Sequence, residues 1–209
     1  GIRCRPDLIK KFFGDPTIVV GKSSEEIRAV STDDRAIFWG MGDDKGERTL
    51  ELGDNSSFHQ GITTTKWSNQ RSDGKDTHDS DDLDTDFFLL RSAEAYLNYA
   101  EAKLRLNQMS EAVAKLDEIR SRAPARSLGS SITLNDILDE RSREFYFEGL
   151  RRPDLIRFGQ YGGAQATYKW TYKGGAYNGV NFKKEFDIFP IPQSEIDAAN
   201  GALKQNPGY

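Results

Sequence analysis

The sequence contains very little that could support redox, metal or nucleophilic chemistry. Its 209 residues include a single cysteine, Cys4, so no disulfide can form within the chain. The two histidines, His59 and His78, lie far apart, and neither has another histidine or cysteine at metal-ligand spacing. No nucleophile elbow, phosphate-binding glycine loop or paired-cysteine motif occurs. Zinc, phosphoryl-transfer and nucleophilic mechanisms therefore have no support in the sequence.

Long basic tracts and long apolar runs are also missing. The formal charge is −4 and the longest basic tract is Arg151-Arg152, so a partner that offers many phosphates is not expected, and we predict no nucleic-acid binding. The longest apolar runs, such as 17–20 and 87–90, fall far short of the roughly 20 residues that cross a bilayer. With 36% hydrophobic residues the chain can nevertheless bury the core of a globular domain.

The first part of the chain has little sustained periodicity. Residues 1–66 contain short apolar pieces between glycines and prolines, which indicates irregular structure with brief extended or helical segments. Residues 68–86 hold seven aspartates and few apolar side chains, which is typical of a polar surface loop. We therefore predict a loop-rich segment over residues 1–86.

The clearest helical pattern begins at Phe88. Apolar residues follow one helical face to Leu106, Asn107 offers a left-handed stop, and Ser110 offers a cap for a second helix that ends near Arg122. So short a link predicts antiparallel packing. Large and small residues meet on the shared face: Tyr96, Ala100, Ala112 and Leu116. This is typical of a tetratricopeptide-like hairpin, and because such repeats need neighbours, stacking partners are expected outside this chain.

A third helix and a turn-rich end complete the expected organisation. Thr133 and Asp136 form a capping-box-like start, and the helix is predicted to run to Glu148 and stop at Gly149. The sequence thus predicts a mainly α fold with long irregular loops. Its helical core spans residues 87–161, and an extended, turn-rich segment spans residues 162–209.

Three glutamates recur at every fourth position of the third helix. Glu140, Glu144 and Glu148 would repel one another on one stripe, so basic groups are expected opposite them. We predict a structural latch in which arginines that follow Gly149 bind the carboxylates, namely Arg151, Arg152 and Arg157. A glycosidase-like carboxylate pair is the alternative, but nearby arginines would keep both carboxyls ionised. We expect no catalytic residue here and no enzymatic activity.

Aromatic residues are the candidates for ligand binding. Tyr168, Trp170 and Tyr172 alternate with polar residues, so an extended segment would place three rings along one face, where sugar rings could stack. The alternative is that the stripe packs on the helices as part of the core. Trp39 and Trp67 lie in loop-rich regions, where binding residues concentrate. The candidate glycan-binding residues are Trp67, Trp39, Trp170 and Tyr172.

The polar loop also contains a weak metal signal. Asp82, Asp84 and Asp86 have the alternating spacing that suits Ca²⁺, yet Phe87 stands where an EF-hand loop needs glycine. A solvated acidic loop is the alternative. We expect no other cofactor.

Several motifs together resemble a known family. The stretch 141–161 reads RSREFYFEGLRRPDLIRFGQY, with FFLLRSAEAYLNYAEAKLR at 87–105 before it and YKWTYKGG at 168–175 after it. The chain closes on FPIPQSEIDAANGALKQNPGY at 189–209, and IRCRPDLIKKFF at 2–13 has the same character. These motifs, in this order, resemble the C-terminal half of the SusD/RagB family of surface nutrient-binding proteins from Bacteroidetes.

The resemblance implies a function and a setting. It implies a helical fold with tetratricopeptide-like repeats, lipid-anchored at the outer membrane on the cell surface. There it would bind an oligosaccharide and deliver it to a SusC-like TonB-dependent transporter. The family's N-terminal half and its lipoprotein signal have no counterpart in this sequence, so that half is an expected partner, and no ligand residue is carried over. The alternative function is a helical repeat scaffold for protein–protein interaction without sugar binding.

Overall fold

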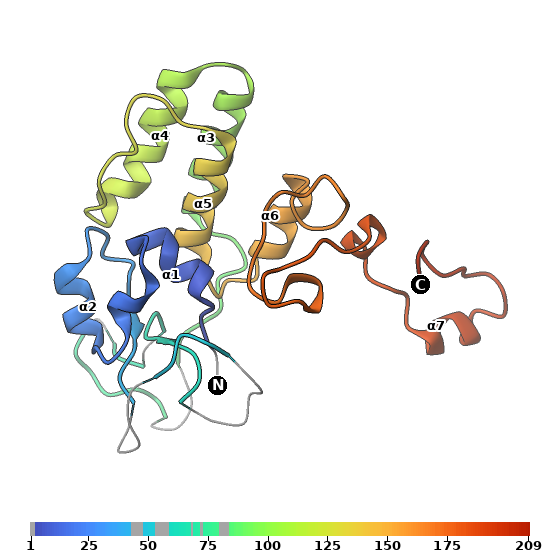
Figure 1. Ribbon diagram of the computed structural model, residues 1–209, viewed down its shortest axis with the longest axis horizontal. Helices are drawn as coiled ribbons and strands as arrows, with labels where there is room; N and C mark the ends of the chain where they lie inside the picture. The colour runs from blue at the N-terminus through green and yellow to red at the C-terminus, as the bar shows by residue number, and fades with distance from the viewer. Residues whose placement is uncertain (1–2, 43–47, 53–58, 68, 72, 80–83) are drawn as a thin grey trace. The chain divides into compact units, whose positions relative to one another are not determined.

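Helices dominate the secondary structure, as the sequence predicts (Figure 1). The computed structural model describes residues 3–42, 48–52, 59–67, 69–71, 73–79 and 84–209. Within these residues, seven α-helices accompany one pair of two-residue strands. The chain divides into two compact units, Gly1–Glu148 and Gly149–Tyr209. The sequence analysis placed residues 149–161 with the helical core, whereas the structure places them in the second unit.

The first unit opens with short elements that the sequence analysis described only as brief segments. They are α1 (Pro6–Phe13), the 3₁₀ helix η1 (Pro16–Val19), α2 (Ser24–Val30), β1 (Phe38–Trp39) and β2 (Thr63–Thr64). Pro6 occupies the first position of α1, where its missing N–H costs nothing. Ser23 and Glu26 form a complete capping box at α2. The strands pair antiparallel, with Trp39 opposite Thr63.

These short elements enclose a hydrophobic core. Its buried members are Cys4, Ile9, Val19, Ile27, Ala36, Phe38 and Ile62. The rings of Phe12 and Phe38 meet edge to face with centroids 5.3 Å apart. Burial raises the pKa of the Cys4 thiol to about 12, so this cysteine is a packing residue. The loop-rich segment therefore has a hydrophobic core of its own. Its residues are too far apart in the sequence to show the periodicity of a helix or a strand.

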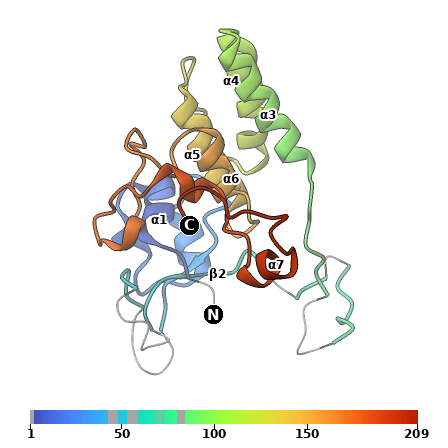
Figure 2. The same ribbon diagram turned by 90° about the vertical axis from the view of Figure 1, so that its right-hand side faces the viewer.

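Helices α3 (Ser92–Arg105) and α4 (Met109–Arg122) form the predicted antiparallel hairpin (Figures 1 and 2). Asn107 has a φ of 59°, which confirms the predicted left-handed stop. The buried face consists of Ala93, Leu97, Ala100, Ala112, Leu116 and Ile119. Tyr96 was predicted on this face, but it is 38% exposed. It precedes Leu97 by one position, which turns its side chain about 100° away around the helix.

The first helix of the hairpin starts later than the sequence suggested. Residues 87–90 lie outside α3 and are exposed, with Leu89 and Leu90 each 83% accessible. The residue before α3, Arg91, has extended backbone, and its side chain bonds to Glu144 and Glu148, far along the chain. This anchoring fixes where the helix begins.

Helix α5 (Leu134–Phe145) packs against α3 and α1. The capping box of Thr133 and Asp136 is present with both hydrogen bonds, as predicted. The helix ends at Phe145, three residues earlier than expected, because Phe147 adopts a left-handed conformation with a φ of 60°. Glu148 is therefore placed by a turn and does not continue a helical stripe.

The second unit is built from short helices and turns. They are α6 (Arg151–Arg157), η2 (Lys173–Gly175), η3 (Lys184–Asp187) and α7 (Gln193–Ala198). Pro153 lies in the first turn of α6, where proline is tolerated. None of the helices in the described residues is both long and apolar enough to cross a membrane.

Candidate functional site

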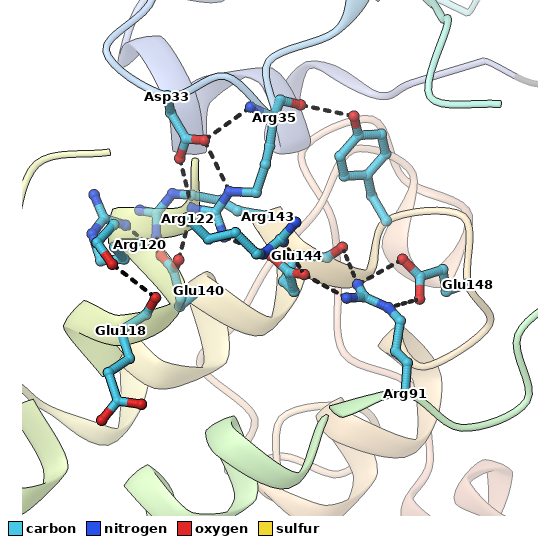
Figure 3. Close-up of polar contacts among 12 residues, drawn as sticks. Asp33, Arg35, Arg91, Glu118, Arg120, Arg122, Glu140, Arg143, Glu144 and Glu148 are labelled. Carbon is cyan, nitrogen blue, oxygen red and sulfur yellow. Dashed lines mark hydrogen bonds and ion pairs between the residues drawn. The ribbon is translucent and has the colours of Figure 1, made fainter. Parts of the chain in front are cut away.

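A network of charged side chains surrounds the C-terminal half of α5 (Figure 3). We call it the charge cluster, and its members are Asp33, Arg35, Lys66, Arg91, Arg120, Arg122, Glu140, Arg143, Glu144 and Glu148. All of them belong to the first unit. They come from five separate segments, so the cluster forms only when the unit folds.

Glu144 binds three arginines. Its carboxylate lies 2.9 Å from Nη1 of Arg35, 2.5 Å from Nη1 of Arg91 and 2.6 Å from Nη2 of Arg122. Burial alone would raise the pKa of Glu144, but the hydrogen bonds from Arg91 and Arg35 outweigh it and lower the pKa. The carboxyl is thus held ionised, which is unsuitable for a general acid at neutral pH.

Glu140 is fully buried and also paired. Nη2 of Arg35 lies 2.7 Å from one carboxylate oxygen, and Nη1 atoms of Arg120 and Arg143 lie 2.5 and 2.7 Å from the other. Arg35 in turn binds Asp33 through Nε at 2.9 Å and Nη2 at 2.7 Å. The guanidinium of Arg35 therefore joins three carboxylates, and these charge-assisted bonds compensate for the burial.

Glu148 completes the cluster beside Lys66. Nζ of Lys66 binds the Glu148 carboxylate and donates to the carbonyl oxygens of Glu144 at 3.0 Å and Tyr146 at 2.9 Å. Nε of Arg91 lies 2.6 Å from Glu148. Burial lowers the pKa of Lys66, and the pairing with Glu148 offsets only part of that effect. The turn after α5 is thus held in place by two cations.

The partners of the three glutamates differ from those predicted. The sequence assigned Arg151, Arg152 and Arg157 to the latch, and the structure instead pairs the glutamates with Arg35, Arg91, Arg120, Arg122, Arg143 and Lys66. The three arginines make contacts inside the second unit. Arg152 donates to the carbonyl of Phe186 at 3.0 Å and lies 3.7 Å from the Phe189 ring centroid. Proximity in sequence favoured the wrong arginines, since the true partners lie up to 109 residues away.

A hollow of about 300 Å³ opens beside the charge cluster. Its lining residues are Asp34, Arg35, Ile37, Lys66, Trp67, Phe88, Arg91, Arg122, Arg143, Glu144, Tyr146 and Glu148. The rings of Trp67 and Phe88 lie 6.5 Å apart at an angle of 31°, and Trp67 is partly exposed. The structure therefore places one predicted ligand candidate, Trp67, at a concave site. Phe88 and the lining arginines were not predicted there, because only the fold brings them together.

The other aromatic candidates lie elsewhere. Trp39 is a partly buried residue of β1. In the second unit, Trp170 stacks on Tyr161 with centroids 5.8 Å apart. The predicted single stripe is wrong for Tyr172, because this residue has a φ of 66° and its ring meets Tyr177 at 5.6 Å. The left-handed turn ends the extended backbone that alternation requires.

A buried lysine organises the second unit's aromatic residues. Lys173 is fully buried, and its Nζ donates to the carbonyl oxygens of Gln160 at 3.1 Å and Tyr168 at 2.8 Å. The same Nζ lies 4.7 Å from the Trp170 ring centroid. Burial, followed by repulsion from Lys169, lowers the pKa of Lys173.

The predicted calcium ligands are only partly described. Asp82 lies outside the described residues, and Asp84 accepts a hydrogen bond from the backbone N–H of His78 at 2.5 Å. Asp86 is exposed. No group of three or more metal-ligating side chains is found among the residues that the structure describes. Calcium binding stays a prediction.

The sequence model of the SusD family matches residues 45–209. The chain belongs to the SusD family. It is 40% identical over 190 residues to the starch-binding protein SusD of Bacteroides thetaiotaomicron, covering 90% of this chain and 33% of that protein. The chain therefore spans about a third of the length of this curated relative.

Solved structures agree with this assignment. Surface glycan-binding protein A from Bacteroides uniformis is 28% identical with a TM-score of 0.59, over 87% of this chain and 40% of that chain. A SusD-like protein from Bacteroides fragilis matches all of this chain and 47% of its own, with a TM-score of 0.65 and 24% identity, which shows a shared fold. These similarities confirm the predicted SusD-like helical fold. The names of the starch-binding protein SusD and of surface glycan-binding protein A each state a carbohydrate ligand.

Proposed function

We propose that this SusD-family chain binds an oligosaccharide at the hollow beside the charge cluster, through Trp67 and Phe88. The observation that carries the proposal is the placement of two neighbouring aromatic rings at the edge of a 300 Å³ concavity lined by fixed polar groups. Aromatic faces with a few convergent polar groups are the usual composition of small-ligand sites. The names of the starch-binding and glycan-binding relatives support the same ligand class.

The charge cluster gives this site a rigid floor. Lys66 directly precedes Trp67, and its Nζ is held by three acceptors. Arg91 lies three residues after Phe88, and its guanidinium is held by Glu144 and Glu148. Both aromatic residues are therefore anchored next to ordered cations. Such support fixes ring positions before a ligand arrives, which reduces the entropy lost on binding.

The wider setting follows from family membership. We propose that the chain functions at the outer membrane, at the cell surface, and that it delivers its glycan to a SusC-like TonB-dependent transporter. We also propose that it binds without turnover, since arginines lower the pKa of the Glu144 carboxyl, which makes it unsuitable as a general acid. Release of sugar on incubation with a polysaccharide would contradict that part.

A glycan array probed with the chain tests the proposal. Binding to at least one class of oligosaccharide is expected. The competing role, a helical repeat scaffold, predicts capture of a protein partner with no glycan bound on the array. That second result would contradict the proposed function.

A further inference from the structure

The hollow at Trp67 does not stand alone, because a second one adjoins it. The second hollow has about 500 Å³ and is lined by Arg91, Ser92, Ala93, Tyr96, Glu118, Ile119, Ser121 and Arg122. Arg91 and Arg122 line both hollows. The two concavities therefore meet at a pair of guanidinium groups, with Trp67 and Phe88 in one and Tyr96 in the other.

Cationic side chains outnumber carboxylates in the lining of the first hollow. Its lining holds five cationic side chains and three carboxylates, and the chain as a whole has a charge of −4. In the second hollow, two arginines face Glu118, which is already paired with Lys115 at 2.7 Å. Asp33 and Glu140, which lie outside the lining, pair with Arg35 and Arg143, so the cation best placed to attract an anionic ligand is the exposed Arg122.

Arg122 has N–H groups that can donate hydrogen bonds to a ligand. Its side chain is 58% exposed, and Nη2 donates to Glu144 at 2.6 Å. Among the residues that the structure describes, Arg122 donates a hydrogen bond to Glu144 through Nη2, and its Nε and Nη1 make no hydrogen bond. Arg143 likewise uses Nε and Nη1 and retains Nη2. Figure 3 shows both guanidinium groups beside Glu140 and Glu144.

The guanidinium groups and aromatic rings of the two hollows indicate which class of ligand fits them. A guanidinium presents its N–H groups in a planar fork that matches a carboxylate, and Arg35 and Arg91 already bind carboxylates in this way inside the cluster. The aromatic rings of Trp67, Phe88 and Tyr96 suit the apolar faces of pyranose rings. A single ligand that supplies both features is a sugar acid.

We propose that the two joined hollows bind an acidic oligosaccharide, in which a pyranose ring packs on Trp67 and its carboxylate binds Arg122. This inference rests on the proposed glycan-binding function and specifies its substrate class. The side chain of Arg122 determines the preference for acidic over neutral sugars. Glu144 orients Arg122, and Arg143, which also lines the first hollow, supplies a second donor.

Calorimetry with a matched pair of probes tests the inference. The probes are a hexameric oligogalacturonate and its fully methyl-esterified form, which have the same rings and differ in charge. We expect the acidic form to bind at least tenfold more tightly, and the preference to shrink as NaCl rises from 50 to 500 mM. Equal affinity for the two forms, or no binding of either, would overturn the inference.

Two arginine variants locate the effect. Arg122→Gln is expected to reduce the preference for the acidic form at least fivefold, while Glu144 keeps Arg35 and Arg91 so that the fold is retained. Arg126→Gln removes the same charge from an exposed residue outside both hollows, and it should leave the preference unchanged. An Arg122→Gln protein with wild-type melting temperature and wild-type preference would contradict the assignment.

Binding of neutral oligosaccharides distinguishes a failure of this inference from a failure of the proposed glycan-binding function. A chain that binds neutral oligosaccharides on the array but not oligogalacturonate retains the proposed function and loses the acidic preference. A chain that binds no glycan at all loses both.

Discussion

Glu144 shows how one buried side chain depends on residues from distant parts of the chain. Its carboxylate accepts bonds from Arg35, Arg91 and Arg122, which come from three segments. A buried ion pair contributes little net stability compared with an apolar pair, but removal of one partner leaves charges uncompensated and is strongly destabilising. The glutamate therefore specifies how these segments meet.

Replacement of this carboxylate should be costly. We expect Glu144→Gln to lower the free energy of unfolding by about 3 kcal/mol, because three guanidinium groups lose their shared counter-charge. Urea denaturation followed by circular dichroism measures the change. Glu118→Gln, which removes an exposed carboxylate paired with Lys115, serves as the control and should leave the midpoint nearly unchanged. Equal midpoints for both variants would contradict the role of Glu144.

The same carboxylates predict how stability responds to acid. The pKa values of Glu144 and Asp33 are lowered in the folded chain, since burial is outweighed by bonds from arginines. Their contribution is fully present above their unfolded pKa values, near about 4, and is lost as pH falls through the lower folded values. We expect the free energy of unfolding to fall steeply below pH ~4, with a shallower slope in Glu144→Gln. Identical slopes would show that Glu144 is not linked to folding.

Residue types were easier to predict from the sequence than residue partners. The spacing of Glu140, Glu144 and Glu148 correctly indicated carboxylates that need cations. It could not identify Arg35 or Arg91, because ion pairs between distant segments leave no trace in local spacing. Trp67 was found through its loop context, whereas Phe88 was assigned to a helix that begins after it.

At the scale of elements, local chemistry predicted some helix boundaries and missed others. The capping box of Thr133 and Asp136 and the left-handed Asn107 are both present because each depends on backbone groups within a few residues. The early end of α5 at Phe145 was missed, since a phenylalanine with positive φ, Phe147, has no sequence signature. Helix α1 was missed because eight residues show too few turns for a period.

Lys173 gives the element-scale prediction. We expect Lys173→Met to destabilise the second unit by about 2 kcal/mol, because the carbonyl oxygens of Gln160 and Tyr168 lose a buried donor. Hydrogen exchange of amides in residues 160–182 measures the effect. Lys169→Met is the matched control, since Lys169 is exposed and its Nζ bonds to the Asn181 side chain. Unchanged protection in Lys173→Met would show that the buried lysine does not support this unit.

At the scale of the whole molecule, the family match and the joined hollows are independent observations, and both support the proposed binding of an oligosaccharide. The sequence motifs over residues 141–161 and 189–209 resemble those of the family. The match of the family's sequence model over residues 45–209 confirms this resemblance. The joined hollows could not be predicted, because their lining comes from residues 34 to 148 and exists only after folding. The family membership supports the proposed class of ligand, while the geometry supports the proposed binding residues.

Calorimetric titration of an array-positive oligosaccharide into wild type, Trp67→Ala and Trp39→Ala tests the central claim most directly. Loss of the Trp67 ring removes about 1 to 2 kcal/mol of stacking and packing, which corresponds to roughly tenfold weaker binding. Trp39→Ala, outside the lining of the hollow, should bind as wild type. Wild-type affinity in Trp67→Ala, with loss of binding in Trp39→Ala, would contradict the claim and move the site away from the charge cluster.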